Sequence, residues 1–266
     1  MKILVVKSIF CCDISFIEII KESIYSLITN IIFFKITDTI SILCIGWLSD
    51  PNYKSMISQI FDSIDLPSNI SIYFNIFELN YGKIYIFNKI KDYITTFDSD
   101  IVLYLDHDIL FTIDYNIFSI MAKLQSVENI GYIALNQLDD CRHQHVIYKN
   151  TIKINNIIIC YPDDLQSIAS GAIIMSKQFL NEINFPLISV YGGDDTLLCE
   201  LAKTKKYIYG VAQDYYIKHP YMDISLTEYI QWKFSSILNF CKLRSNNYSD
   251  PQDYHKLIIR SHEWKK

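Results

Sequence analysis

The feature that most constrains the fold is a regular alternation between short apolar runs rich in β-branched residues and longer segments with helical spacing. Four apolar runs are predicted to be strands: residues 2–8, 40–46, 70–77 and 100–105. Four segments with helical spacing are predicted to be helices: residues 15–28, 53–64, 84–96 and 115–126. Strands that alternate with helices build a mostly parallel sheet with helices on both faces, so we expect an α/β fold with a Rossmann-like first half.

The rest of the chain predicts a second half and a helical end. Residues 136–168 hold polar clusters and few periodic signals, so we expect a long loop with some strand that becomes ordered when ligand binds. Five elements are predicted after it: a strand at 169–175, helices at 176–183 and 194–204, and strands at 206–210 and 214–218. Residues 224–262 predict two helices. Because the sequence has no repeat or Gly/Ser linker, we expect one domain over 1–266, divided into 1–135, 136–223 and 224–266.

Charge and composition exclude several classes of partner. The net charge is −5, and the basic residues form no cluster that would neutralise phosphates, so nucleic acid is not an expected partner. No apolar run reaches the roughly 18 residues that a membrane-spanning helix needs, and the start MKILVVKSIF has no leader-type cleavage site. The seven cysteines are an odd number, and Cys11 is adjacent to Cys12. We therefore expect reduced thiols in a cytoplasmic protein without a membrane span.

A first pair of acids follows the most apolar predicted strand. Ile101–Leu105 runs directly into Asp106-His107-Asp108, at the strand end where open α/β sheets bind their ligands. If the backbone stays extended, Asp106 and Asp108 point to the same side, roughly 6–7 Å apart. Two such carboxylates need a cation, and a hard divalent ion such as Mn²⁺ or Mg²⁺ would also neutralise a diphosphate. The alternative is a solvated acidic turn.

A second pair of acids stands at the start of a predicted helix. Gly192-Gly193 allow a sharp turn, and Asp194 and Asp195 follow at the expected N-cap and first turn. The helix dipole favours ionised acids there, and an ionised carboxylate in a cleft can serve as a general base. The alternative is that these acids only cap the helix.

Histidines offer two further candidate metal ligands. His219 ends a predicted strand and could reach a metal held by Asp108, although a lone histidine is also a common structural residue. Cys141, His143 and His145 stand at every second position and could lie on one face of a strand, but no fourth ligand is near in the sequence. We interpret that second group as surface rather than as a zinc site.

Three blocks of the sequence resemble a known family. Ser170-Gly171-Ala-Ile-Ile-Met-Ser176, Ile183-Asn-Phe185-Pro186 and Tyr191-Gly192-Gly193-Asp194-Asp195 are similar to the C-terminal block of the β-1,4-galactosyltransferases, whose relatives include the polypeptide GalNAc-transferases. The resemblance covers about residues 80–220. It implies a GT-A type glycosyltransferase with a Rossmann-like sheet and a smaller acceptor-side lobe.

The resemblance also implies roles for individual residues. Asp108 and His219 would bind the metal, and Asp106 would contact the metal or the ribose or sugar of the donor. Asp195 would be the catalytic base of an inverting transfer, and Asp194 would hold sugar hydroxyls. Gly192 and Gly193 would approach the donor.

The same resemblance implies the substrates. The donor would be a nucleotide-sugar, UDP-linked by default, carrying a hexose or N-acetylhexosamine. The acceptor would be a hydroxyl of a glycan, glycoprotein or other molecule. Lys83 and Asn88 lie in a segment similar to one that builds the nucleotide pocket.

The sequence departs from the family pattern at three places. Asp194 replaces the usual Glu, Tyr191 replaces the usual Trp, and Lys7-Ser-Ile-Phe-Cys11 replaces an arginine-bearing turn. These differences leave the nucleotide and the acceptor contacts open.

Three other readings remain. A phosphatase of the haloacid dehalogenase class also uses D-x-D after an apolar strand, but its motif stands near the start of the fold and wants Thr or Val where this chain has Leu110. A nucleotidyltransferase needs a Gly-rich basic loop, which residues 8–15 do not supply. The third reading is a catalytically inactive nucleotide-sugar-binding module.

Overall fold

The computed structural model describes residues 1–138, 150–162, 167–187, 192–220, 235–238, 240–241 and 259–260. Its strands are β1 Lys2–Cys11, β2 Thr39–Leu48, β3 Ile70–Phe77, β4 Leu79–Asn80, β5 Ile101–Leu105, β6 Ile130–Gln137, β7 Asn150–Ile154, β8 Ile157–Tyr161, β9 Ala172–Ser176, β10 Ile208–Ile217 and β11 Ile259–Arg260. Its helices are α1 Ser15–Phe33, α2 Asn52–Asp62, α3 Gly82–Thr96, α4 Ile117–Gln125, α5 Lys177–Glu182 and α6 Asp194–Thr204. The fold is α/β, as the alternating pattern predicts.

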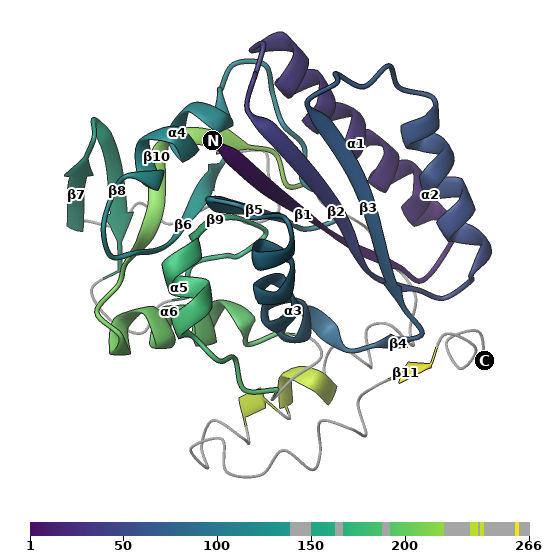
Figure 1. Cartoon of the computed structure of the whole chain (residues 1–266). Helices are drawn as coiled ribbons and strands as arrows, with labels where there is room; N and C mark the ends of the chain where they lie inside the picture. Colours follow the sequence, from purple (N-terminus) through teal and green to yellow (C-terminus); the bar gives the residue numbers. More distant parts are fainter. Residues whose placement is uncertain are drawn as a thin grey trace.

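One large sheet forms the centre of the described structure (Figure 1). Its strand order is β3-β2-β1-β5-β9-β6-β10-β8-β7. β3, β2, β1 and β5 are parallel neighbours, and β6 and β10 are also parallel. β9 runs antiparallel between β5 and β6, which brings the residues just before β9 beside the residues just after β5. This insertion connects the two halves of the sheet.

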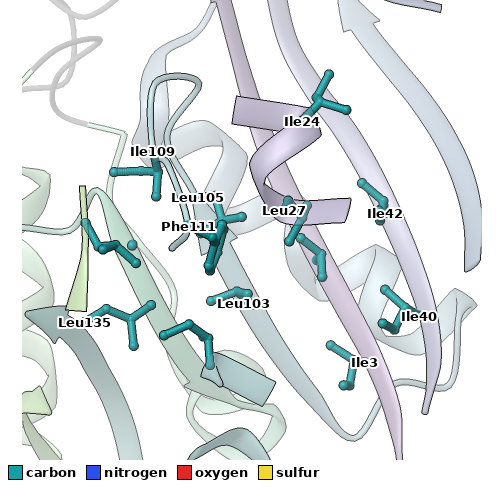
Figure 2. Close-up of a cluster of buried hydrophobic side chains, with 14 of the residues drawn as sticks. Ile3, Ile24, Leu27, Ile40, Ile42, Leu103, Leu105, Ile109, Phe111 and Leu135 are labelled. Carbon is teal, nitrogen blue, oxygen red and sulfur yellow. The ribbon is translucent and has the colours of Figure 1, made fainter. Parts of the chain in front are cut away.

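Helices cover both faces of the sheet and enclose two apolar cores. On one face, side chains of α1, α2 and α4 pack against residues such as Ile3, Val5 and Leu103. Figure 2 shows Ile24 and Leu27 of α1 lying over this face. On the other face, α3, α5 and α6 pack against alternate residues such as Leu4 and Val6. Because both faces are buried, the central strands are continuously apolar rather than alternating.

The structure corrects several predicted elements in the second half and at the end of the chain. β6 was not predicted as a strand, although its sequence IGYIALNQ is apolar. The two strands predicted near 206–210 and 214–218 are one strand, β10, with an irregular register between Ala212 and Tyr216. Residues 259–260 pair with β4 as strand β11, so the helix predicted there is wrong.

The predicted loop 136–168 contains more strand than its polar composition indicates. β7 and β8 form an antiparallel hairpin at the edge of the sheet. Residues 139–149 and 163–166, which include Cys141, His143 and His145, lie outside the described residues. That residues 136–168 become ordered when ligand binds stays a prediction.

The buried cysteines and the helix lengths bear on the expectations drawn from composition. Five of the cysteines that the structure describes are buried thiols outside any disulfide: Cys11, Cys12, Cys44, Cys160 and Cys199. In the described part of the chain, no helix combines the length and the apolar character that crossing a membrane requires.

Candidate functional site

A cavity of about 280 Å³ opens at the carboxyl ends of β1 and β5. These two strands lie side by side, and the chain leaves them in opposite directions across the sheet, as at the ligand-binding crevice of other open α/β sheets. The polar side chains of its lining include Lys83, Asp106, Asp108, Asp194, Asp195 and His219. The aromatic side chains of its lining include Phe10, Trp47, Phe77 and Tyr81. Both predicted acid pairs therefore lie in one cavity.

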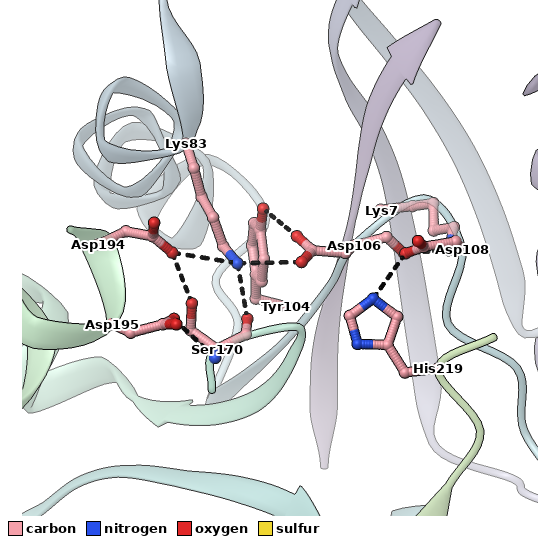
Figure 3. Close-up of polar contacts among 9 residues, drawn as sticks. All are labelled: Lys7, Lys83, Tyr104, Asp106, Asp108, Ser170, Asp194, Asp195 and His219. Atoms are coloured by element: carbon pink, nitrogen blue, oxygen red, sulfur yellow. Dashed lines mark hydrogen bonds and ion pairs between the residues drawn. The ribbon is translucent and has the colours of Figure 1, made fainter. Parts of the chain in front are cut away.

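Asp106 and Asp108 do not share a side, contrary to the prediction. Strand β5 ends at Leu105, and residues 107–108 form a turn, so the alternation of an extended strand stops before the motif. Asp106 faces Lys83, whose Nζ lies 3.1 Å from Oδ2, and accepts a hydrogen bond from the Tyr104 hydroxyl. Asp108 faces His219 instead (Figure 3).

Asp108 and His219 form a buried pair at the base of the cavity. The Asp108 and His219 side chains are 3% and 9% exposed, and His219 Nε2 lies 3.3 Å from Asp108 Oδ1. Backbone hydrogen bonds between Leu110 and Lys218 join the segments after β5 and β10, which places the two residues opposite each other. Burial opposes ionisation of Asp108, but His107, His219 and Lys7 outweigh it and hold the pKa of Asp108 well below its ordinary value.

The donor atoms of this pair suit a divalent cation. Oδ1 of Asp108 is buried and faces His219 Nε2 at 3.3 Å, and a buried carboxylate oxygen is stabilised by a positively charged partner. Carboxylate oxygen beside imidazole nitrogen is a donor set that metal ions such as Mn²⁺ accept. The described residues contain no group of three His, Cys, Asp or Glu side chains arranged around one point. Asp108 and His219 could thus supply two ligands to such an ion.

A buried lysine, Lys7, binds the backbone of the turn that carries Asp106 and Asp108. Reasoning from the sequence did not select this residue. Lys7 is 0% exposed, and its ammonium donates hydrogen bonds to the backbone carbonyl of Asp106 and to the Ser23 hydroxyl. The Ser23 hydroxyl donates in turn to the carbonyl of Ile109. Burial lowers the pKa of Lys7 to about 8, although Asp108 and Asp106 act in the opposite direction. These bonds fix the backbone on both sides of Asp108.

Replacing Lys7 by methionine should therefore destabilise the protein. The variant keeps the apolar stem but leaves the Asp106 carbonyl without its donor and Asp108 without a nearby cation, and we expect a loss of roughly 2–3 kcal/mol in the free energy of unfolding. Urea denaturation measures this loss. Lys2→Met is a matched control, because Lys2 lies on the same strand but forms an exposed ion pair with Asp98. Equal losses for the two variants would contradict the structural role of Lys7.

The Gly-Gly turn places the second acid pair at the start of α6. Gly192 and Gly193 have φ angles of +75° and +80°, a conformation that favours glycine. A Cβ on Gly193 would lie 2.3 Å from the ring of Phe240, so the turn also needs glycine for space. Gly193 itself is the N-cap, which corrects the expectation that an aspartate occupies it. Tyr191 lies outside the described residues.

Lys83 connects the two acid pairs. Its Nζ lies 3.1 Å from Asp106 and 3.3 Å from Asp194, and it donates to the carbonyl of Ser170 at 2.9 Å. Figure 3 shows the ammonium between the two carboxylates. Burial opposes its charge, but Asp106, Tyr104 and Asp194 raise the pKa of Lys83 well above its ordinary value. Lys83 is therefore a fixed cation in the cavity.

Asp194 and Asp195 have different environments although they are neighbours. Burial would raise the pKa of both acids, but Lys83 and a hydrogen bond from Ser170 lower that of Asp194. Burial and the adjacent charge of Asp194 raise the pKa of Asp195 to about 7. The expectation that the helix start keeps Asp195 fully ionised is thus corrected, because burial and the charge of Asp194 outweigh Lys83 and the hydrogen bonds from Ser170. Two acids whose pKa values diverge are suited to separate chemical roles.

Asn88 does not reach the cavity. Its side-chain amide donates to the backbone carbonyl of Phe185 at 2.7 Å and accepts from the Phe185 N–H, so it fixes α3 against the segment after α5. Lys83, the second residue of α3, does line the cavity. Of the two candidates from this segment, the structure brings only Lys83 to the acids.

Three residues of the site were missed by reasoning from sequence. Lys7 had a usable signal, because a lysine inside the apolar run KILVVKSIF must find buried partners. Tyr104 and Ser170 had none, because a tyrosine in a core strand and a serine before a strand are common.

Comparison with known proteins supports the fold. No family model matches the chain, and no curated protein matches it. Among solved structures, it is similar to S. aureus TarS 1–349 in complex with UDP-GlcNAc, with a TM-score of 0.58 and 12% identity over 85% of this chain. It is also similar to the mannosyltransferase PcManGT from Pyrobaculum calidifontis in complex with GDP-Man and Mn²⁺, with a TM-score of 0.58 and 14% identity over 96% of this chain.

These similarities establish the fold and no more. The chain has the mixed α/β architecture of glycosyltransferase structures, with a large, mostly parallel sheet flanked by helices. It spans 60% of the length of the TarS 1–349 chain and 67% of the PcManGT chain. The specific resemblance to the β-1,4-galactosyltransferases stays a prediction.

Proposed function

We propose that this protein is a metal-dependent glycosyltransferase that uses a nucleotide-sugar donor. The observation that carries the proposal is the convergence of two acid pairs with different chemistry on one cavity. The buried Asp108–His219 pair offers carboxylate oxygen and imidazole nitrogen to a cation, and the Asp194–Asp195 pair contains an acid whose pKa is about 7. A fold shared with glycosyltransferases supports the proposal.

The aromatic and the polar residues of the lining suit the two ends of such a donor. Phe10 and Trp47, which pack against each other, and Phe77 offer flat apolar surface to a nucleoside. The diphosphate would then lie near Asp108 and His219. Its oxygens would complete the coordination of Mn²⁺ or Mg²⁺, which supplies positive charge for the departing diphosphate when bound. UDP is the nucleotide that we propose, and binding to UDP-GlcNAc by TarS supports this choice.

Lys83 and Asp106 would orient the donor between the two pairs. Asp106 accepts from Lys83 and Tyr104 and remains 25% exposed in its side chain, so it can accept a further bond from a ribose or sugar hydroxyl. The Lys83 ammonium lies 3.3 Å from Asp194, where it can also attract a phosphate oxygen.

Asp195 would remove the proton from the acceptor. Its Oδ1 accepts a hydrogen bond from the backbone N–H of Ser170 at 2.8 Å, which leaves Oδ2 for the acceptor hydroxyl. As the proton moves to Asp195, the hydroxyl oxygen attacks the anomeric carbon and the nucleoside diphosphate leaves from the opposite face, so the transfer inverts the anomeric configuration. Asp194, ionised beside Lys83, would hold sugar hydroxyls.

The proposed division of the chain follows this chemistry. Residues 1–135 would bind the donor, and residues 136–223 would supply the acceptor side and the base, within one catalytic domain over 1–266. The acceptor that we propose is a hydroxyl of a glycan, a glycoprotein or a similar molecule.

A panel of nucleotide-sugars tests the proposal directly. The protein is incubated with Mn²⁺, each nucleotide-sugar and a mixture of sugar acceptors, and products are identified by mass spectrometry. We expect transfer, or slow hydrolysis to the nucleoside diphosphate, with at least one donor. Release of inorganic phosphate from phosphomonoesters would instead support a phosphatase. Binding of nucleotide-sugars without turnover of any would indicate an inactive binding module.

The raised pKa of Asp195 predicts the pH dependence of the reaction. An acid with a pKa of about 7 is protonated below pH 7 and cannot accept a proton, so kcat should fall about tenfold per pH unit on the acid side and level off above pH 7. Initial rates at saturating donor and acceptor measure this profile. A flat profile across pH 7 would show that Asp195 does not titrate in the reacting complex.

A further inference from the structure

Ser170 contacts three charged groups of the site through three different atoms. Its hydroxyl donates to Asp194 Oδ2 at 2.7 Å, and its backbone N–H donates to Asp195 Oδ1 at 2.8 Å. Its carbonyl accepts from Lys83 at 2.9 Å. Ser170 is 1% exposed, so these bonds form away from solvent. Figure 3 shows the residue between the acid pair and the lysine.

The three contacts are not equivalent. A backbone N–H is present at every position except proline, and so is a carbonyl. The hydroxyl is the contact that depends on the serine side chain, and its single proton is donated to Asp194. The same side chain also lowers the pKa of Asp195, which accepts the bond from the backbone N–H. A hydrogen bond to a buried carboxylate favours its ionised form, so loss of the hydroxyl should raise the pKa of Asp194 more than that of Asp195.

The position of Ser170 is fixed by the sheet. The next residue, Gly171, accepts a hydrogen bond from the backbone N–H of Asp106 at 2.7 Å, just before β9 pairs with β5. A Cβ on Gly171 would lie 3.3 Å from the His219 ring and 3.4 Å from Asp106 Oδ2, so the backbone approaches both closely. The hydroxyl of Ser170 is thus held in register with the first acid motif.

We propose that the Ser170 hydroxyl is a positioning group that assigns different roles to Asp194 and Asp195. By donating to Asp194, it directs the negative charge to the acid that pairs with Lys83, and it leaves Asp195 as the acid that exchanges a proton with the acceptor. This inference rests on the proposed function for its kinetic consequence, but the charge distribution is a property of the free protein. Ser170→Ala removes the hydroxyl and keeps both backbone contacts.

Carboxyl NMR of the free protein tests the charge distribution without any substrate. In the wild type we expect two separated steps, with Asp194 titrating below its ordinary range and Asp195 near pH 7. In Ser170→Ala the pKa of Asp194 should rise, because Asp194 loses the hydrogen bond from the hydroxyl. The two titration steps should then lie closer together in pH. The variant leaves the other titratable groups around the pair in place: Lys83, Asp106, Tyr132 and Cys199.

Steady-state kinetics test the consequence for the reaction. If the hydroxyl acts through Asp194, Ser170→Ala should raise the KM for a sugar about tenfold, because a hydrogen bond to a charged group contributes on the order of 1.5–3 kcal/mol. In an Asp194→Asn background the same substitution should add little, which a double-mutant cycle measures. Additive effects of the two substitutions would overturn the proposed coupling.

Ser176→Ala is the matched control. Ser176 stands at the other end of β9, where its hydroxyl accepts from the Phe179 N–H and caps α5. Its removal should lower thermal stability without changing the carboxyl titration or the KM. If Ser170→Ala behaves like this control, with reduced stability and unchanged titration, the positioning role is wrong. If the wild type transfers no sugar, the proposed function fails, and the NMR titration still decides the role of Ser170.

Discussion

Replacement of Asp195 by asparagine is expected to lower kcat at least about 100-fold while the affinity for the donor stays nearly unchanged. Asparagine preserves the size of the side chain and can still accept the hydrogen bond from Ser170. It cannot take a proton from the acceptor. Because proton transfer occurs only in the transition state, the loss should fall on kcat rather than on ground-state binding. Single-turnover rates and donor titrations, followed through the fluorescence of Trp47 in the cavity wall, separate the two effects.

Asp194→Asn is the matched control for this prediction. Asp194 is adjacent in sequence and equally part of the cavity, but it pairs with Lys83. Its contacts to a sugar would be the same in the ground state and in the transition state, so its loss should raise the KM with a smaller effect on kcat. If both variants lose only affinity, or if Asp195→Asn keeps the wild-type kcat, the base lies elsewhere and the inverting assignment fails with it.

Removal of the divalent cation should have the second large effect. With EDTA, or in Asp108→Asn, we expect donor affinity to fall about 100-fold, since a bound cation contributes several kcal/mol to holding a diphosphate. Asp108 is 2% exposed, and its carboxylate is one of the two ligands that the structure offers. Isothermal titration of the nucleoside diphosphate, with and without Mn²⁺, measures the change.

An exposed acid supplies the control for the metal prediction. Asp114 lies on the surface in the turn after the acidic motif, so Asp114→Asn should bind the donor and Mn²⁺ like the wild type. Circular dichroism and thermal melting of Asp108→Asn distinguish a lost ligand from a lost fold. Equal donor affinity in Mn²⁺ and in EDTA would remove the metal from the mechanism.

The first half of the fold could be predicted from the sequence because the apolar residues of each strand and helix follow one clear pattern. β3 has the predicted bounds, and β1, β2 and β5 begin within one or two residues of them. The second half was harder. The antiparallel placement of β9 and the pairing of β6 with β10 are tertiary contacts, and no local period in Ala172–Ser176 specifies a direction within the sheet.

The candidate site was predictable where residue type carries the chemistry. Asp106, Asp108, Asp194, Asp195 and His219 meet in one cavity. The directions of their side chains were not predictable, because the chain turns directly after Leu105 and the alternation of the strand no longer applies. The divergence of the Asp194 and Asp195 pKa values was also hidden, since it depends on Ser170 and Lys83 from distant parts of the sequence.

The antiparallel strand β9 determines how changes in the length of the chain affect the site. It joins the backbone of Gly171 to that of Asp106, so the relative position of the two acid pairs is set by the sheet and not by the length of chain between them. The long excursion from β6 to β9 includes the β7–β8 hairpin at the outer edge of the sheet. Changes in the length of that segment should therefore leave the spacing between the two acid pairs unchanged, because the backbone bond between Gly171 and Asp106 fixes it.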